Sequence, residues 1–219
     1  MGHMTKLDEI ALTIELVLIS IIEGVALTRL GEDAVPVFQS TEALQYVPYV
    51  LAGLTILLVF WAQAILHTVS VIRWPLYMEH MLLYFIAAFL QVIAYSNIGN
   101  GTAWFFWWSL FSLCALVIYL VDLRIIKEVV PRFSQLQSGE PYIAEVLRRH
   151  LFELRFLVPS ALIFNIGACA LMFFNPDLFT NPLAYATLGG LQFLISLGAL
   201  ADCARNFKER SAMLPALFR

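Results

Sequence analysis

Six apolar stretches, each long enough to cross a lipid bilayer, occupy most of this chain. A membrane-spanning helix needs about 20 predominantly apolar residues, and the helix satisfies its own backbone hydrogen bonds in lipid. The stretches predict an all-α polytopic membrane protein with six transmembrane helices. We expect these spans at about residues 10–30, 46–71, 77–98, 103–123, 156–174 and 183–201.

The composition agrees with a protein whose surface faces lipid. Hydrophobic residues make up 61% of the 219 residues and charged residues only 13%, whereas a soluble domain carries about 25% charge. The net charge of −3 gives no reason to expect nucleic-acid binding. Cys114, Cys169 and Cys203 stand far apart in the sequence. They predict neither a disulfide framework nor a zinc site. No H-x-x-x-H or H-E-x-x-H motif occurs in the sequence either, so we expect no metal and no cofactor.

Basic residues fall almost entirely on one side of the predicted topology. With six spans, twelve of the thirteen Lys and Arg residues lie near the chain ends, at Arg73 or in residues 124–155. The positive-inside rule then places both termini in the cytoplasm, and we expect a bacterial inner membrane. The predicted organisation is a tag remnant and N-terminus at 1–9, one transmembrane domain at 10–204, and a cytoplasmic tail at 205–219.

The segment before the fifth predicted span has the pattern of an amphipathic cytosolic helix. Ser138 stands where a helix N-cap would, and Pro141 lies in the first turn. Arg148, Arg149 and Arg155 would draw this helix onto the anionic inner leaflet. The alternative is that it binds a protein partner at the cytoplasmic face.

Four tryptophans fall near the ends of predicted spans. Trp104, Trp107 and Trp108 are expected at the outer membrane interface and Trp74 at the inner one. Tryptophan is enriched at both interfaces because its ring is amphipathic. The sequence therefore predicts these residues as interface anchors.

Two carboxylates interrupt the first span, at Glu15 and Glu23. A carboxylate at membrane depth costs about 2.5–3.5 kcal/mol on insertion scales, so it needs a partner, a proton or a water-filled cavity. His67, near the cytoplasmic end of span two, should lie at the depth of Glu15 and could pair with it. Glu23 has no such obvious partner, which makes it the foremost candidate for a functional carboxylate.

Neutral polar residues lie inside other predicted spans. Their simplest role is hydrogen bonding between helices. The alternative is that they line a path for an ion or substrate together with Glu23, Glu15 and His67. These neutral candidates are Gln63, Gln91, Asn165 and Gln192.

One short segment resembles a known group of proteins. Residues 23–30 (EGVALTRL) at the outer end of the first predicted span, together with Trp61 in the second, resemble a family of uncharacterised bacterial six-span membrane proteins. The resemblance implies the six-span fold and no activity.

Three functions remain open from the sequence. The first is a channel or transporter for a cation, proton or small solute, expected to be a homo-oligomer. The second is a non-catalytic membrane component that binds a protein partner at the cytoplasmic face. The third is a membrane enzyme that acts on a lipid or quinone at that face. Its candidate residues are His67, Glu79, His80, His150 and Glu153.

Overall fold

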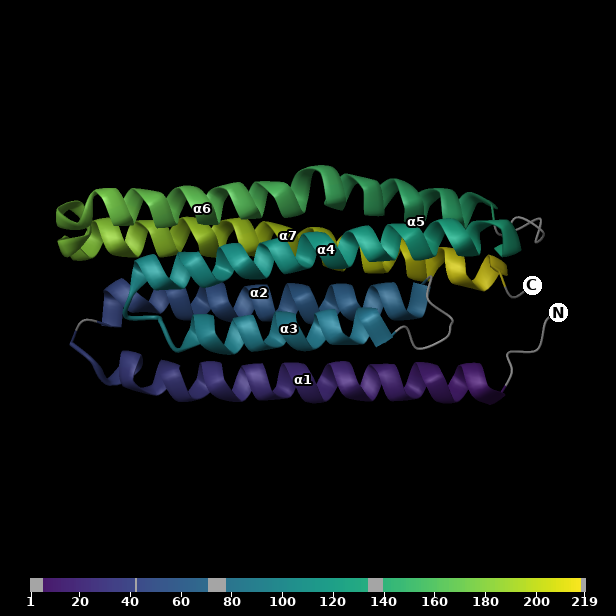
Figure 1. The fold of residues 1–219 in the computed structure, drawn as a ribbon, viewed down its shortest axis with the longest axis horizontal. Helices are drawn as coiled ribbons and strands as arrows, with labels where there is room; N and C mark the ends of the chain where they lie inside the picture. Colours follow the sequence, from purple (N-terminus) through teal and green to yellow (C-terminus); the bar gives the residue numbers. More distant parts are fainter. Residues whose placement is uncertain (1–5, 42, 71–77, 134–139, 218–219) are drawn as a thin grey trace.

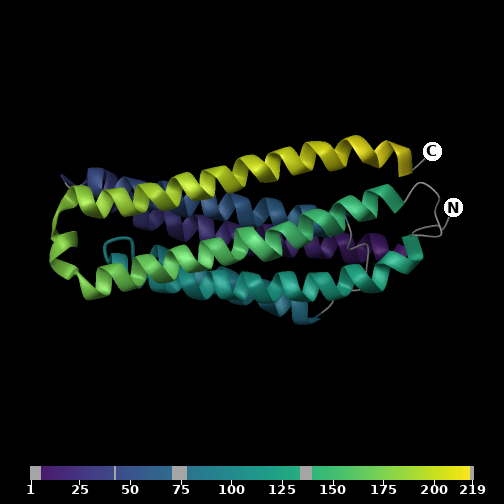
Figure 2. The same ribbon diagram turned by 90° about the horizontal axis from the view of Figure 1, so that it is seen from above.

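The computed structural model describes residues 6–41, 43–70, 78–133 and 140–217, and every regular element among them is helical. The helices form one elongated bundle and run roughly along its long axis (Figures 1 and 2). In chain order the elements are α1 (Lys6–Gln39), α2 (Ala43–Ser70), α3 (Met78–Tyr95), α4 (Gly101–Phe133), α5 (Glu140–Phe152), the π-helical turn η1 (Glu153–Leu157), α6 (Val158–Phe174), the 3₁₀ turn η2 (Pro176–Thr180) and α7 (Pro182–Leu217).

Four stretches of helix are long and apolar enough to cross a membrane. They are Ala43–His67, Gly101–Glu128, Ala144–Phe174 and Pro182–Glu209, and the apolar stretch Glu79–Tyr95 is shorter. By helix length and hydropathy, the chain is a multi-span membrane protein, which confirms the coarse prediction. That α1 and α3 also span the membrane stays a prediction, although both lie in the same bundle (Figure 1).

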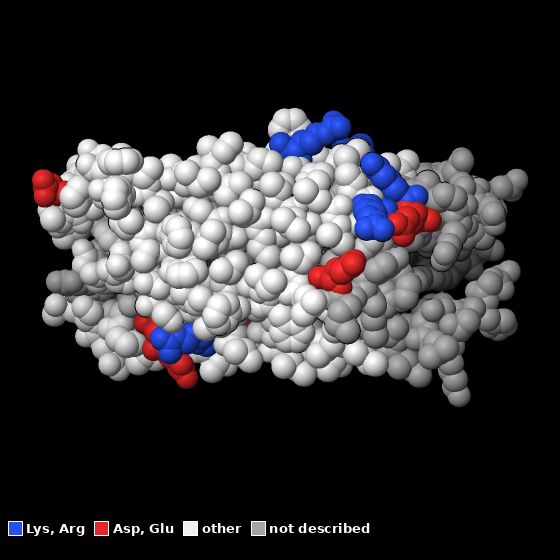
Figure 3. All heavy atoms as spheres, in the orientation of Figure 1, with Lys and Arg blue, Asp and Glu red and all other residues white. Residues whose placement is uncertain are grey.

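The outer surface of the bundle is largely apolar. Large side chains on α6 and α7 are well exposed, including Ile163, Phe173, Leu183 and Leu194. In the face shown in Figure 3, uncharged side chains cover most of the surface, and the described charged residues form a few separate groups. Large exposed apolar patches mark contact with a membrane or a partner.

The start of α1 and the end of α7 lie at the same end of the bundle, here named the terminal end (Figure 1). The connections α1–α2, α3–α4 and α6–α7 lie at the opposite end, here named the loop end. This arrangement agrees with an even number of passes. Which end faces the cytoplasm stays a prediction.

The most extensive helix contacts pair α2 with α7 and α4 with α6, while α3 packs on α4 and α1 on α2. One close approach joins α2 to α7: a Cβ built on Gly189 would lie 2.5 Å from the ring of Tyr49. The Tyr49 hydroxyl also donates to the Tyr185 carbonyl at 3.0 Å. Small residues at such crossings let helices approach closely in membrane bundles.

The structure corrects the prediction that Trp104 and Trp108 are interface anchors. Both rings are in the core, 0% and 1% exposed, and they pack edge-on with centroids 5.6 Å apart. Trp104 donates its indole N–H to Gln192 on α7 at 2.6 Å, a partner that a sequence pattern does not reveal. Trp107 is half-buried, so its anchor role stays a prediction, and Trp74 lies outside the described residues.

The predicted amphipathic helix runs on into α6 along the same line (Figures 1 and 2). The π turn between α5 and α6 is closed by Val158 N–H donating to the Glu153 carbonyl, five residues earlier. The next residue, Pro159, has no backbone N–H to donate. Widening the turn therefore loses no hydrogen bond at this position. Glu153 and Val158 are both buried. The buried positions on the two sides of this turn are therefore five residues apart, one more than in an α-helix.

Arg149 also differs from its predicted place on the lipid surface. Its side chain is buried and lies 3.1 Å from Asp202 and 3.5 Å from Glu209, both on α7. This ion pairing joins α5 to α7 near the terminal end. Arg148 and Arg155 are exposed, as the surface-helix prediction requires.

Candidate functional site

Five ionisable side chains meet inside the bundle, toward its terminal end. We name this group the buried polar centre. None of its members is more than 5% exposed. Charged or ionisable groups at membrane depth are costly and usually functional. The members are His67 on α2, His80 on α3, Asp122 on α4, His150 on α5 and Glu153 at the start of the π turn.

Asp122 connects the two histidines of α2 and α3. Its Oδ2 accepts a hydrogen bond from Nδ1 of His67 at 2.8 Å, and its Oδ1 lies 2.8 Å from Nε2 of His80. A buried carboxylate between two imidazoles has its charge compensated, because either ring can supply an N–H or a positive charge. Asp122 thus fixes the orientation of both rings.

His150 and Glu153 come from the segment that ends α5. Three residues apart, they lie on one helix face, and both point into the bundle, where they are buried. His150 Nε2 lies 2.8 Å from the backbone carbonyl of Tyr119, and its ring stacks on the Tyr119 ring with centroids 5.0 Å apart. The Tyr119 carbonyl can only accept, so the Nε2 of His150 carries the proton.

Amide side chains hold the Glu153 carboxylate in place. Oε1 of Glu153 accepts from Gln63 Nε2 at 3.2 Å and from Asn206 Nδ2 at 3.5 Å. The Tyr119 side chain is a further partner of this carboxylate. Oε2 lies 3.9 Å from Nε2 of His67, which is too long for a hydrogen bond. One ligand atom each from His67, His150 and Glu153 lies within 4.8 Å of the others, so these three residues could hold a metal ion.

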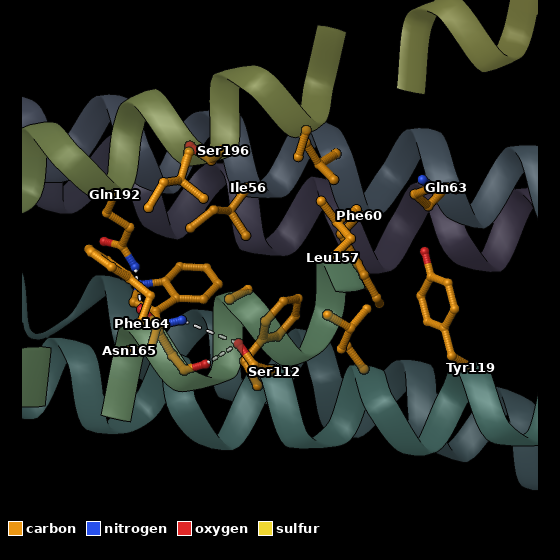
Figure 4. Close-up of a pocket in the computed structure, with 18 residues that line it drawn as sticks. Ile56, Phe60, Gln63, Ser112, Tyr119, Leu157, Phe164, Asn165, Gln192 and Ser196 are labelled. Atoms are coloured by element: carbon orange, nitrogen blue, oxygen red, sulfur yellow. Dashed lines mark hydrogen bonds between the residues drawn. The ribbon is translucent and has the colours of Figure 1, made fainter. Parts of the chain in front are cut away.

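An apolar cavity of about 140 Å³ adjoins the buried polar centre. Its walls come from α2, α4, α6 and α7 and the π turn, and Phe60, Leu157 and Phe164 lie along it (Figure 4). At one end of the view are Gln63 and Tyr119, the two side chains that also contact Glu153. Its volume matches that of a cavity which holds one small ring, about 150 Å³.

A chain of hydrogen bonds borders the other end of the cavity (Figure 4). Asn165 donates to Ser112 at 3.3 Å, and Gln192 donates to Asn165 at 2.9 Å while accepting from Trp104 at 2.6 Å. This chain ties α4, α6 and α7 together, the simpler of the two roles considered for such amides. A role for Asn165 and Gln192 in a path stays a prediction.

The remaining path candidates lie elsewhere. Glu23 is 4% exposed, and neither of its oxygens has a hydrogen-bond partner among the described residues. It interacts electrostatically with Tyr95 on α3, whose hydroxyl in turn lies 3.4 Å from Oε1 of Gln91. The Glu15 side chain lies outside the described residues. His67, the predicted partner of Glu15, donates a hydrogen bond from its ring to Asp122.

Sequence reasoning found some of this site and missed the rest. His67 and Gln63 were predicted, and His80, His150 and Glu153 were named under the enzyme hypothesis, which required them to converge. Glu79, from the same set, is exposed. Asp122, Tyr119 and Asn206 were missed. Asp122 carried a signal, because a carboxylate near the end of an apolar run raises the same question as Glu23.

No protein-family model, curated protein or solved structure matches this chain. The resemblance of residues 23–30 to uncharacterised six-span bacterial proteins stays a prediction.

Proposed function

We propose that this chain is a membrane enzyme that binds a lipid or quinone in the apolar cavity and acts on its polar end at the buried polar centre. The observation that carries the proposal is the shared pair, Tyr119 and Gln63. Both border the cavity, and both contact the Glu153 carboxylate. A ligand in the cavity would therefore meet groups that connect directly to the ionisable residues.

The cavity favours a lipophilic ligand with a small polar head. Its walls are mostly aliphatic and aromatic, and they lie between helices apolar enough for a membrane. Ligand sites typically combine such walls with a few placed polar groups that fix orientation. A ring or a short chain segment fits the volume of about 140 Å³. A longer tail would extend between α6 and α7, which pack on different partners, α4 and α2.

The chemistry that these residues can perform is proton transfer. The Gln63 amide has a second N–H that can donate to a carbonyl or carboxyl oxygen of the ligand. The Tyr119 hydroxyl can donate to the same oxygen by giving up its bond to Glu153. The ionisable residues of the buried polar centre can accept or supply a proton in the same reaction, as general acid–base groups do. Hydrogen bonds aimed at an oxygen that gains negative charge stabilise that charge.

Binding of defined probes tests the proposal. A short-chain ubiquinone and a medium-chain fatty acid are titrated into the purified protein by calorimetry. Ala161 borders the cavity, so Ala161→Phe fills it and weakens binding at least tenfold. Ile163 is 70% exposed on the same helix, so Ile163→Phe is the matched control and leaves binding unchanged. Absence of binding by both probes, or equal binding by the Ala161→Phe variant, overturns the proposal.

A second variant tests the polar end. Tyr119→Phe keeps the ring and removes the hydroxyl. The loss of one hydrogen bond, about 0.5–1.5 kcal/mol, corresponds to a roughly two- to tenfold weaker affinity. Unchanged affinity would place the polar end of the ligand away from Tyr119.

Cation or proton transport is the second candidate, and Glu23 favours it. A buried carboxylate with no hydrogen-bond partner among the described residues is unusual, and within membranes such groups mark ion pathways. A path along α1 would require a homo-oligomer, because α1 lies at the edge of the bundle, against α2 and α3 (Figure 1). The oligomer, a protein partner at the cytoplasmic face and the bacterial inner membrane all remain predictions. Ion flux into liposomes tests this candidate: Glu23→Gln abolishes flux, and flux at the wild-type rate rejects the role of Glu23.

A further inference from the structure

We infer that His67, His150 and Glu153 bind one divalent first-row transition metal ion, such as Zn²⁺ or Fe²⁺. The inference concerns the buried polar centre of the proposed function, but it needs neither the cavity nor a ligand in it. Its basis is the arrangement of lone pairs and hydrogen bonds around the three side chains.

Hydrogen bonds select which ring nitrogens can coordinate. Nδ1 of His67 donates to Asp122, and Nε2 of His150 donates to the Tyr119 carbonyl, each at 2.8 Å. Each neutral ring therefore keeps its lone pair on the other nitrogen. The coordinating atoms are Nε2 of His67 and Nδ1 of His150, and both rings are buried.

The surroundings have the pattern of an outer ligand shell. Histidines that bind metals usually donate their second N–H to a carboxylate or a backbone carbonyl, and carboxylate ligands are themselves hydrogen-bonded. His67 has the carboxylate of Asp122, and His150 has the Tyr119 carbonyl. Glu153 has Gln63 and Asn206 on Oε1, and its Oε2 is directed toward His67 at 3.9 Å.

The spacing fits an ion after a small adjustment. Bonds of about 2.0–2.2 Å from zinc to nitrogen and oxygen place tetrahedral ligand atoms about 3.4 Å apart. One ligand atom from each residue already lies within 4.8 Å of the others. Oε2 of Glu153 lies 3.9 Å from Nε2 of His67. Side-chain rotations that move the ligand atoms by about 1 Å close the remaining difference, and Glu153 has the most rotatable bonds of the three.

The ligand set indicates the class of metal and leaves room for a reaction. Two imidazoles and one carboxylate suit zinc, and they are also the ligands of non-haem Fe²⁺ sites. Three protein ligands leave at least one position open, as in catalytic sites. Tyr119, which stacks on His150 and borders the cavity, brings the contents of the cavity within reach of that position.

Metal content of the purified full chain tests the inference. The protein is prepared in detergent without chelator, with no lipophilic probe added, and its metals are measured by mass spectrometry. About one zinc or iron per chain is expected, and the measurement identifies which. Chelator-treated protein is then titrated with Co²⁺, whose visible absorption reports coordination by nitrogen and oxygen.

Variants separate a metal site from a proton-sharing cluster. His150→Gln and Glu153→Gln each lose the bound metal and the Co²⁺ absorption. Asp122→Asn, which disturbs the orientation of His67 and removes no ligand, weakens Co²⁺ binding about 10- to 100-fold. Glu79→Gln, an exposed carboxylate at the same end of the bundle, is the control and binds as the wild type does.

The results also distinguish this inference from the proposed function. Ala161→Phe keeps its metal even though it loses the lipophilic probe. Should a variant fail to fold, as judged by circular dichroism, the wild-type titration alone decides. Wild-type protein that neither carries metal nor binds Co²⁺ overturns the inference, as does a folded His150→Gln variant that binds Co²⁺ with unchanged affinity.

Discussion

The carboxylate of Asp122 on α4 accepts a hydrogen bond from the imidazole of His67 on α2 at 2.8 Å, inside a bundle of apolar helices. α2 and α4 are not among the helix pairs that pack extensively against each other. This bond therefore crosses the space between two helix pairs, α2 with α7 and α4 with α6. It connects them beside the cavity.

Replacing Asp122 with Asn should lower the free energy of unfolding by about 1–3 kcal/mol, because a charge-assisted hydrogen bond to a buried group is lost. Thermal unfolding in detergent measures the change. Asp177→Asn, on the exposed turn η2, is the control and should stay within about 0.5 kcal/mol of the wild type. Equal stability of the two variants would show that the His67–Asp122 bond contributes nothing.

Glu23→Leu should raise the free energy of unfolding by about 1–3 kcal/mol, the cost of a buried polar group that has no hydrogen-bond partner. Neither oxygen of Glu23 has a hydrogen-bond partner among the described residues. Glu23→Gln keeps a polar side chain and should bring no such gain. A clear loss of stability in Glu23→Leu would reveal a partner for this carboxylate.

Gly189→Ala should destabilise the protein by about 1–3 kcal/mol through overpacking, because the added Cβ would meet the Tyr49 ring at 2.5 Å. The neighbouring Gly190 offers a matched control, since a Cβ there meets nothing within 4 Å. Unfolding in detergent compares the two. If Gly190→Ala proves the more harmful, the close packing of α2 on α7 is misplaced.

Trp104→Phe should cost about 1–3 kcal/mol, because it leaves the oxygen of buried Gln192 without its indole donor. Trp107→Phe, at a half-buried position on the same helix, should change stability by about 0.5 kcal/mol or less. Chemical unfolding followed by fluorescence measures both. An interface-anchor role for Trp104 would make the two variants alike.

Hydropathy was sufficient to predict the helices. It did not predict which side chains of different helices contact each other. The apolar runs predicted which parts of the chain are helical, because a run of about 20 apolar residues has one stable form in lipid. The helices α1, α4 and α7 extend well beyond the predicted span ends at residues 30, 123 and 201. Trp104 shows the limit: it lies at a helix start in the sequence, and the same position can face lipid or a neighbouring helix. Only the packing of α4 against α6 and α7 decides between them.

The candidate site was predictable in part for the same reason. Polar residues in apolar runs, such as His67 and Gln63, are visible in a sequence. Their partners are not, because His67 and Asp122 belong to α2 and α4, with the whole of α3 between them in the sequence. The sequence favoured Glu15 as the partner of His67 by depth alone, and depth does not fix which faces meet.

The π turn at Glu153–Leu157 has a consequence for how α5 and α6 are aligned about their common axis. One additional residue in a helical turn offsets the two halves by about 100° relative to an uninterrupted α-helix. If the same sequence ran as a plain α-helix, α5 would be rotated by that angle, and Leu151 would occupy the place of His150. The widened turn thus sets the phase between the two halves, and it keeps an imidazole, rather than an aliphatic side chain, opposite His67.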